Sequence, residues 1–372
     1  MAPGFTDPNP DYWEEYGPFQ RVKHDLIRCY LNGWFPKLGT WAGRVLYVDT
    51  HAGRGRHVSG EPGSPLIALR TFLEHSYRDE LLKKSEFRFL FIERDPANLD
   101  ELGRELSTLG TLPNRVHVDT NVGDAFEKLS ELVDQLRRDG KKMAPAFVFL
   151  DPYGFKIPAR LLADLMSAGR VELFINVIWR ELDMAVAQRP EAGTGMADTL
   201  DAIFGGDDWR TAIDAEDVDE RLDQAVRLLA SKVGAKWWTY IRMVSGGKAT
   251  RYLLLHLTNH DKGRDLIKDC VWRICPDGGY YVRKSDDSSQ PMLIQPEPDL
   301  RPLRHWVLER LRARPHRWNE LEEAIRAELW RATHLNQMIR ELRREKAIVA
   351  GSFSGKFSPK ANPLLRLRRA DE

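Results

Sequence analysis

The sequence predicts an α/β protein with a mostly parallel sheet, an antiparallel hairpin at the edge of that sheet, and a smaller C-terminal domain. Three observations lead to this prediction. Short apolar segments alternate with segments of helical periodicity over residues 18–180, two apolar segments flank "SGGKAT" at 245–250, and the composition changes near residue 285. Strands that alternate with helices imply right-handed crossovers and parallel pairing.

Five helices and five strands are predicted in the first part of the chain. Apolar residues recur at helical spacing in 19–38, 64–76, 96–106, 125–138 and a segment that begins at about 158. The strand segments are 43–50, 87–95, 115–124, 147–154 and 171–178, and their continuous apolar character is typical of parallel strands buried on both faces. Ser64 is expected to cap the second helix, with Pro65 in its first turn.

The segments 237–244 and 251–258 are too close together for a parallel crossover, so we expect them to form the antiparallel edge hairpin. Five parallel strands followed by such a hairpin are the outline of a Rossmann-like class I methyltransferase sheet. We therefore predict an irregular arm at 1–17 and a methyltransferase-like α/β domain at 18–285, with a mostly helical insertion at about 181–235.

The remainder of the chain is predicted to be a separate domain. The polar, proline-rich stretch at 286–300 is typical of a linker. Residues 301–372 contain three helical patterns, a short apolar segment, the turn "SGKF" and the final segment "PLLRLRR". Three short helices followed by a small hairpin are the plan of a winged-helix-like domain.

A glycine-containing loop follows the first predicted strand. Asp49 ends that strand, and the loop continues as "THAGRGR" with Ala52, Gly53 and Gly55. Glycine allows a tight turn and close approach of a ligand to the backbone, and a loop in this position can hold the phosphate or sugar part of a nucleotide-like cofactor. The alternative is a glycine-rich surface loop without a ligand.

Two further acids follow the next strands. Glu93 ends the second strand, where a carboxylate can accept hydrogen bonds from a ribose diol, and Asp95 is a rival for that role. Asp124 follows the third strand and can reach an adenine amino group, although it is also a good helix N-cap. With Asp49, Ala52, Gly53 and Gly55, Glu93 and Asp124 complete the predicted site for S-adenosylmethionine (SAM).

The fourth strand ends in "DPYG". Asp151, Pro152 and Tyr153 resemble the [D/N/S]-P-P-[Y/F] signature of amino-methyltransferases, with the aromatic residue one place early. The resemblance implies that Asp151 and a proline-held carbonyl accept hydrogen bonds from the target amine, while the aromatic ring stacks on the target. A simple turn is the alternative. Pro152 fixes its own φ and keeps Asp151 out of helical geometry.

Three polar residues near these strand ends have roles that the sequence leaves open. Asn176 lies inside the apolar fifth strand, and a buried amide needs hydrogen-bond partners, so it either bonds the neighbouring strand end or faces the site. Lys23 and His24 lie on the helix before the first strand, and His24 could be a base, a substrate contact or an ordinary helix histidine.

Nucleic-acid binding is predicted for the C-terminal domain. The net charge of the chain is only +1, so an anionic partner must be bound by a local patch. The helix "HLNQMIRELRREK" carries Arg340, Arg343 and Arg344, which are suited to phosphate or base contacts. The alternative is a solvated helix face, because Glu341 and Glu345 dilute the positive charge.

Several segments together resemble the three-Cys-motif partner (TcmP) family. They include "VKHDLIRCYL", "GRVLYVDTHAGRGRH", "SGEPGSPLIAL", "FVFLDPYGFKIP", "FGGDDW" and "YLLLHLTNHDKGRDLIKDCVWRI", which lie within residues 18–285. The resemblance implies a class I methyltransferase-like fold and a working relation to a radical-SAM-type protein, whose cysteines give the family its name. It implies no substrate and no set of catalytic residues.

Two functions from different classes follow from these observations. The first is a SAM-dependent methyltransferase acting on a nucleobase or another planar amine of nucleic acid, together with the radical-SAM-type partner. The second is a non-catalytic scaffold of the same fold that binds nucleic acid and recruits the partner.

The absence of a membrane-length apolar run and of a secretory h-region predicts a cytoplasmic protein. No metal site is expected, because Cys270 and Cys275 have no second Cys/His pair at zinc spacing nearby.

Overall fold

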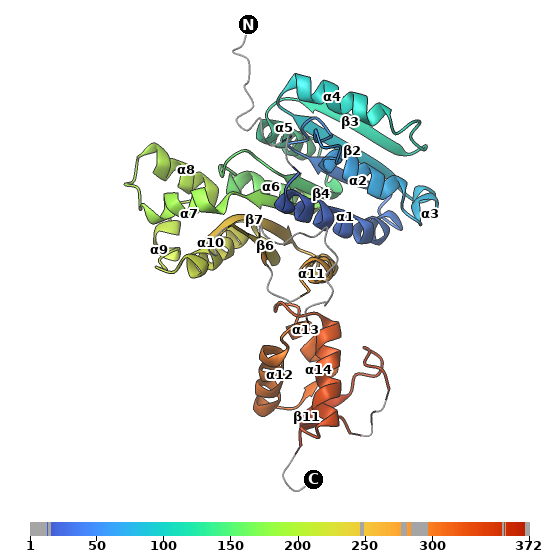
Figure 1. Ribbon diagram of the computed structural model, residues 1–372, viewed down its shortest axis with the longest axis vertical. Coiled ribbons are helices and arrows are strands. Elements are labelled where there is room, and N and C mark those ends of the chain that lie inside the picture. The colour runs from blue at the N-terminus through green and yellow to red at the C-terminus, as the bar shows by residue number, and fades with distance from the viewer. Residues whose placement is uncertain are drawn as a thin grey trace. The chain divides into compact units, whose positions relative to one another are not determined.

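The computed structural model describes residues 13, 16–245, 249–276, 281–283, 297–351, 353 and 355–368 (Figure 1). The chain forms two compact units. Of the described residues, those up to 266 and 281–283 belong to the first unit, and 267–276 with those from 297 onward belong to the second. Most of the N-terminal arm and of the predicted linker therefore lies outside the described residues.

The first unit alternates helices and strands as predicted. Its elements are α1 (Pro18–Gly39), β1 (Arg44–Asp49), α2 (Ser64–Leu73), α3 (Arg78–Leu82), β2 (Glu86–Glu93), α4 (Pro96–Ser107), β3 (Val116–Val122), α5 (Ala125–Arg138), β4 (Met143–Leu150), α6 (Ala159–Ala168), β5 (Gly169–Val177), α7 (Trp179–Ala187), α8 (Gly195–Phe204), α9 (Trp209–Ala212), α10 (Val218–Val233), β6 (Trp237–Ser245), β7 (Ala249–Thr258) and β8 (Tyr281–Arg283). The helix α11 (Asp261–Ile274) begins in the first unit and ends in the second.

The strands form one sheet in the order β3-β2-β1-β4-β5-β7-β6-β8. The strands β1 to β5 pair in parallel, whereas β7 pairs antiparallel with both β5 and β6. This order confirms the predicted mostly parallel sheet of the Rossmann-like methyltransferase type. Because β1 to β5 are parallel, their carboxyl ends lie along the same edge of the sheet.

Two details of the prediction were wrong. The hairpin β6–β7 is not the edge of the sheet, because β8 returns after α11 and pairs in parallel with β6. Ser64 is not the N-cap of α2, since the cap position is occupied by Gly63. The hydroxyl of Ser64 instead acts on the buried carboxyl of Asp49, whose pKa it lowers.

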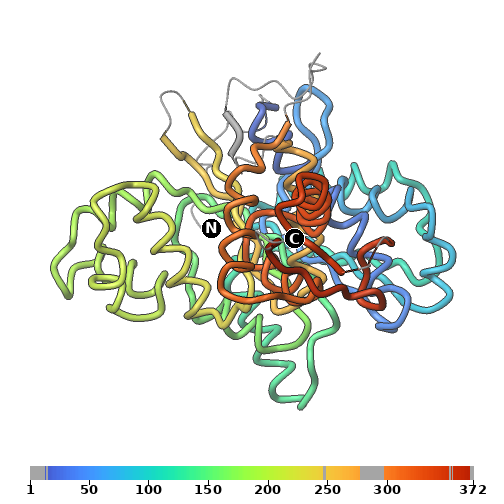
Figure 2. The backbone as a smooth tube through the Cα atoms, turned by 90° about the horizontal axis from the view of Figure 1, so that it is seen from below, coloured from blue at the N-terminus to red at the C-terminus, as the bar shows by residue number. Residues whose placement is uncertain are grey.

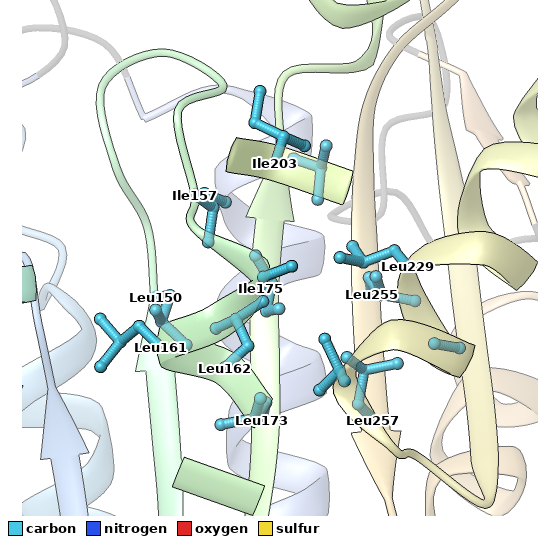
Figure 3. Close-up of a cluster of buried hydrophobic side chains, with 14 of the residues drawn as sticks. Leu150, Ile157, Leu161, Leu162, Leu173, Ile175, Ile203, Leu229, Leu255 and Leu257 are labelled. Atoms are coloured by element: carbon cyan, nitrogen blue, oxygen red, sulfur yellow. The ribbon is translucent and has the colours of Figure 1, made fainter. Parts of the chain in front are cut away.

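Side chains alternate between the two faces of the sheet and make each face apolar. On one face, aliphatic residues of β4, β5 and β7 pack against α6, α8 and α10, as shown by Leu150, Ile175, Leu162, Ile203 and Leu229 in Figure 3. On the other face, aromatic rings of α1 and α2 pack against rings of the strands. These pairs are Tyr30–Phe147, Trp34–Phe147 and Phe72–Phe87.

Four helices, α7 to α10, fill the segment between β5 and β6 that was predicted as a helical insertion. In both the ribbon and the tube view, these helices lie at the opposite end of the sheet from α4 and β3 (Figures 1 and 2). They add to the core through Leu200, Trp209 and Leu222, all almost completely buried.

The second unit contains α12 (Arg301–Ala313), β9 (His316–Arg317), α13 (Trp318–Ala324), α14 (Ala332–Arg344), β10 (Ile348–Val349) and β11 (Leu364–Leu367). The three strands form an antiparallel sheet in the order β10-β11-β9. The helices close over a core that includes Leu303, Leu321, Leu335, Ile339 and Leu365. The second predicted helix is shorter than expected, ending at Ala324.

Candidate active site

The carboxyl edge of the sheet gathers most of the predicted site residues. The register aligns Asp49 of β1 with Phe91 of β2 and with Phe149 of β4. In the same way Glu93 aligns with Val122 of β3, and Leu150, which precedes Asp151, aligns with Ile175. Residues that follow these strand ends are therefore neighbours in space although they are distant in the sequence.

The loop after β1 folds back against β2. The N–H of Ala52 donates to the carbonyl of Ile92 at 3.0 Å, and the N–H of Gly53 donates to Oε2 of Glu93 at 2.7 Å. Gly53 and Gly55 have φ values of 61° and 87°, in the left-handed region that glycine adopts without steric cost. The loop thus presents its backbone beside the carboxylate of Glu93.

Glu93 holds this loop in place. Its Oε2 accepts the Gly53 N–H, and its Oε1 accepts the N–H of Asp95 at 2.9 Å. An ionised carboxylate has about four lone-pair positions, so two remain for a ligand. The rival acid Asp95 is the N-cap of α4, where its side chain accepts from the N–H of Ala97.

Trp13 of the N-terminal arm lies against the same loop, which the sequence did not predict. Its carbonyl accepts the N–H of Val58 at 2.8 Å, and the guanidinium of Arg54 lies 5.1 Å from the centre of its ring. A β-carbon at Gly53 would be only 2.1 Å from Cζ2 of Trp13. The ring therefore covers Gly53 on the side where a side chain would project.

Asp124 acts as the N-cap of α5. Its Oδ1 accepts from the N–H groups of Phe126 at 3.0 Å and Glu127 at 3.1 Å. The helix-capping alternative considered from the sequence is therefore confirmed. The other carboxylate oxygen is not used by the cap, so the predicted cofactor contact is compatible with this role.

Asp151 lies between two partners from other elements. Lys23 of α1 forms an ion pair with its Oδ2, and Nδ2 of Asn176 in β5 donates to its Oδ1 at 2.7 Å. The side chain of Lys23 is 5% exposed and that of Asp151 is 13% exposed. Asn176 thus bonds the neighbouring strand end, which is one of the two roles expected from the sequence.

The turn after Asp151 separates a buried residue from an exposed one. Pro152 is buried, whereas the ring of Tyr153 is 48% exposed. Gly154 has a φ of 97°, so the turn uses a left-handed backbone that favours glycine. An exposed aromatic side chain therefore lies two residues from the paired carboxylate.

The electrostatics of the edge differ from strand to strand. Burial raises the pKa of Asp49 to about 7, and the nearby charge of Asp151 adds to this effect, against opposing hydrogen bonds from Ser64, His51 and Tyr47. Burial also acts to raise the pKa of Asp151, but Lys23 and the hydrogen bond from Asn176 outweigh it and lower that pKa below its usual value.

Two buried histidines lie close to Lys23. Nδ1 of His24 is 2.9 Å from the hydroxyl of Tyr16, and the ring centres of His24 and His57 are 6.1 Å apart. Burial and then the charge of Lys23 lower the pKa of His24 well below 6.5, so the imidazole is neutral at physiological pH. His24 is therefore a buried, hydrogen-bonded histidine of α1.

The three arginines predicted for nucleic-acid contact do not share one environment. Arg340 and Arg344 are exposed one turn apart on α14. Arg343 is half-buried, its guanidinium bonds the carbonyl of Phe353, and it lies 5.9 Å from the centre of that ring. Of the three, Arg340 and Arg344 present their charge to solvent.

No helix within the described ranges is long and apolar enough to span a bilayer. In the part of the chain that the structure describes, no three His, Cys, Asp or Glu side chains come together as a metal site.

No protein-family model and no curated protein matches the chain. Similar solved structures include Trm1 from Pyrococcus horikoshii with S-adenosyl-L-methionine, at 14% identity and a TM-score of 0.40 over 70% of this chain and 62% of that chain. An O-methyltransferase from Bacillus cereus in complex with SAH has 13% identity and a TM-score of 0.34 over 66% of this chain and 83% of that one. The methyltransferase domain of bacterial CtHen1 has 12% identity and a TM-score of 0.30 over 63% and 99%.

The fold class rests on the strand order of this chain, which is that of the Rossmann-like methyltransferases. The chain spans less than two thirds of the length of Trm1. Membership of the three-Cys-motif partner family stays a prediction from the sequence.

Proposed function

We propose that the protein binds SAM and transfers its methyl group to an amine of a nucleobase or another planar target in nucleic acid. The observation that carries this proposal is the common edge formed by the parallel strands. There the glycine loop after β1, the carboxylate of Glu93 and the "DPYG" turn after β4 follow neighbouring strand ends. Ligands of open α/β sheets bind at such carboxyl ends.

The residues present fit the cofactor. Gly53 and Gly55 turn the loop back beside Glu93 through left-handed φ values, with Trp13 and Leu102 against the sides where side chains would project. Glu93 keeps two acceptor positions that suit the hydroxyls of a ribose. Asp124 has one carboxylate oxygen outside the helix cap for an adenine amino group. Asp49, at the end of β1, and Ala52, in the loop after it, complete the residues that we expect to contact SAM. When bound, SAM supplies an electrophilic methyl group on a sulfonium, and the electrons of the broken C–S bond stay on the sulfur.

The "DPYG" turn would hold the target. The carboxylate of Asp151 accepts hydrogen bonds from the amine, Pro152 stiffens the turn, and the exposed ring of Tyr153 stacks on the flat face of the target. This arrangement aims the nitrogen lone pair at the methyl carbon. After the N–C bond has formed, the nitrogen loses a proton to water. Proximity and alignment supply most of the acceleration.

The second unit would supply affinity for nucleic acid. The order of its elements, with a short strand after α12 and a strand pair after α14, agrees with the winged-helix-like domain predicted from the sequence. Arg340 and Arg344 are exposed on α14 and suited to phosphate contacts. Arg343 would act indirectly, by holding the backbone of Phe353.

A non-catalytic scaffold is the second candidate, and one observation favours it. Both oxygens of Asp151 already accept hydrogen bonds, from Lys23 and Asn176, so the carboxylate is less open than a dedicated amine acceptor. In this alternative the chain binds nucleic acid and recruits a radical-SAM-type protein. Such a partner is implied by the resemblance to the three-Cys-motif partner family.

Transfer of label separates the two candidates. The purified protein is incubated with methyl-labelled SAM and total nucleic acid from cells that lack the gene. Incorporation into RNA or DNA supports the methyltransferase, and Asp151→Ala should abolish it while SAM affinity and melting temperature stay close to wild type. SAM binding without incorporation supports the scaffold.

A further inference from the structure

We infer that Lys23 is a positioning residue of the active site, which holds the carboxylate of Asp151 ionised and fixed in direction toward the target amine. This inference rests on the proposed methyl transfer and assigns a part of it to α1, a helix that precedes the sheet. Neither the glycine loop nor the "DPYG" turn contains this residue.

The helix α1 is anchored so that Lys23 reaches the carboxyl edge. Tyr30, seven residues or two turns further along the same face, donates its hydroxyl to Glu172 of β5. The rings of Tyr30 and Phe147 are 5.3 Å apart. With the helix fixed on the sheet in this way, the ammonium of Lys23 lies at the end of β4, 6.0 Å from the centre of the Phe149 ring.

Burial of the Lys23 ammonium costs free energy unless an opposite charge compensates it. Its side chain is 5% exposed, and a buried ammonium loses much of its hydration. Asp151 supplies the opposite charge, and Asn176 fixes the second carboxylate oxygen at 2.7 Å. The carboxylate therefore has one orientation, set from two elements that are far apart in the sequence.

The carboxylate stays accessible although it is paired. Asp151 keeps 13% of its side-chain surface exposed, more than twice the fraction of Lys23, and two of its lone-pair positions are not used by the two partners. A target amine can therefore donate to a carboxylate that is already oriented. The neighbouring Tyr153 ring is exposed on the same turn.

The charged and titratable groups around Asp151 decide whether it is ionised. Lys23 of α1, Asn176 of β5 and His51 after β1 favour the ionised form, whereas burial opposes it. The carboxyl of Asp49 and the hydroxyl of Tyr47, both on β1, also feel the charge of Asp151. Burial is the largest single influence and opposes ionisation, so the pKa of Asp151 should rise when Lys23 no longer offsets it.

The pH dependence of methyl transfer distinguishes a positioning role of Lys23 from a purely structural ion pair. A target acceptor must be ionised, so the acid limb of methyl transfer reports the pKa of Asp151. Removing the charge at position 23 should move that limb to higher pH. A change that only weakens the fold would lower activity at all pH values without moving the limb.

The experiment compares Lys23→Met, Lys23→Arg and a matched control, Lys37→Met. Lys37 is exposed on the same helix. Methyl transfer from labelled SAM to total nucleic acid from gene-deleted cells is measured as kcat/KM from pH 5 to pH 9. The wild-type acid limb should lie below the ordinary aspartate value of 3.8, so wild-type kcat/KM should stay level down to pH 5. In Lys23→Met the limb should move upward by about one to two pH units, so that kcat/KM begins to fall between about pH 6 and pH 5. Lys23→Arg and Lys37→Met should keep the limb of the wild type.

An unmoved acid limb in folded Lys23→Met overturns the inference. If Lys23→Met does not fold, Lys23→Gln, which keeps a hydrogen-bond donor without the charge, gives the same comparison. Failure of the proposed function is recognised separately in the wild type, because calorimetry with SAM and label transfer are measured there first. Wild-type protein that binds SAM but transfers no label overturns both claims.

Discussion

Asp49 and Asp151 end neighbouring strands, yet their surroundings drive their pKa values in opposite directions. Asp49 is completely buried and has no cationic partner among the influences on its pKa, which rises to about 7. Asp151 is paired with Lys23, which lowers its pKa. Two carboxyl groups with such different pKa values can take different protonation states at neutral pH.

The first prediction concerns the stability that Asp49 confers. Its folded-state pKa of about 7 exceeds the ordinary value of 3.8, so the folded protein binds the proton more tightly than the unfolded chain does. The stabilising contribution is complete below about pH 4 and is lost as the pH rises to 7, by up to about 1.4 kcal/mol per pH unit. Asp49→Asn cannot ionise, so its free energy of unfolding should rise relative to wild type over this range.

Urea denaturation of both proteins at pH 5, 6, 7 and 8 tests this. The difference between their free energies of unfolding should change steadily from pH 5 to 7 and level off above pH 7. Parallel pH profiles would show that Asp49 is not proton-bound in the folded state.

The second prediction concerns the contact between Gly53 and Trp13. Gly53→Ala would place a β-carbon 2.1 Å from the ring and impose a left-handed φ of 61° on alanine. The loop must shift, and the hydrogen bond from Gly53 to Glu93 should be lost. We expect SAM to bind at least about tenfold more weakly, which corresponds to about 1.4 kcal/mol.

Gly43→Ala is the matched control. Gly43 has a similar φ of 71°, but no atom lies within 4 Å of its would-be β-carbon. Titration calorimetry should therefore show near wild-type affinity for Gly43→Ala. Equal affinity of the two variants would mean that the Gly53 loop does not contact the cofactor.

At the scale of single elements, α11 contributes to the second unit through its C-terminal half. Nζ of Lys268 donates to the carbonyl of Ile325 at 2.9 Å, at the end of α13, and Nε1 of Trp272 donates to the carbonyl of Leu329 at 2.9 Å. A cation at a helix C-terminus satisfies carbonyls that have no partner within the helix.

The third prediction follows from this cap. Lys268→Met should lower the free energy of unfolding by about 1–3 kcal/mol, because a buried carbonyl loses a charged donor. Lys262→Met, at an exposed position of the same helix, should change it by less than about 0.5 kcal/mol. Chemical denaturation of the full chain measures both. Similar stabilities would show that Lys268 does not cap α13.

The helix α14 provides the fourth prediction. Arg340→Ala with Arg344→Ala removes two exposed charges, so the slope of log affinity against log salt concentration should fall by about 2. Fluorescence anisotropy with labelled duplex DNA and structured RNA measures this slope. Arg312→Ala, exposed on α12, is the control and should leave the slope unchanged. If the double variant binds like wild type, α14 is not the nucleic-acid surface.

At the scale of the whole molecule, the parts that the sequence predicted well are those determined locally. The apolar central strands, the cap at Asp124 and the antiparallel hairpin depend on neighbouring residues, and all are present. The third predicted strand differs, because β3 lies at the edge of the sheet and is mostly exposed. A local pattern could not predict that β8 extends the sheet beyond the hairpin, because its three residues show no alternation or apolar run.

The candidate site also has parts that the sequence could predict and parts that it could not. The acids at the strand ends could be predicted, because a parallel sheet brings strand ends together. For Asn176 the sequence predicted only that the buried amide needs a partner, and the structure shows that this partner is the neighbouring strand end. The pairing of Lys23 with Asp151 spans 128 residues, and the contact of Trp13 with Gly53 arises from an arm without periodicity. Neither has a sequence pattern, so both required the three-dimensional structure.

Titration calorimetry of the wild-type chain with SAM and with its demethylated product tests whether the carboxyl edge of the sheet binds the cofactor. ATP and NAD serve as controls, because they share the adenosine part but lack the sulfur-linked amino-acid side chain that SAM and its product carry. We expect saturable binding of SAM and of its product at one site per chain, with weaker binding of both controls. Absence of saturable heat with either ligand up to about millimolar concentration, or equal affinity for ATP, would contradict the assignment of this sheet edge as a SAM site.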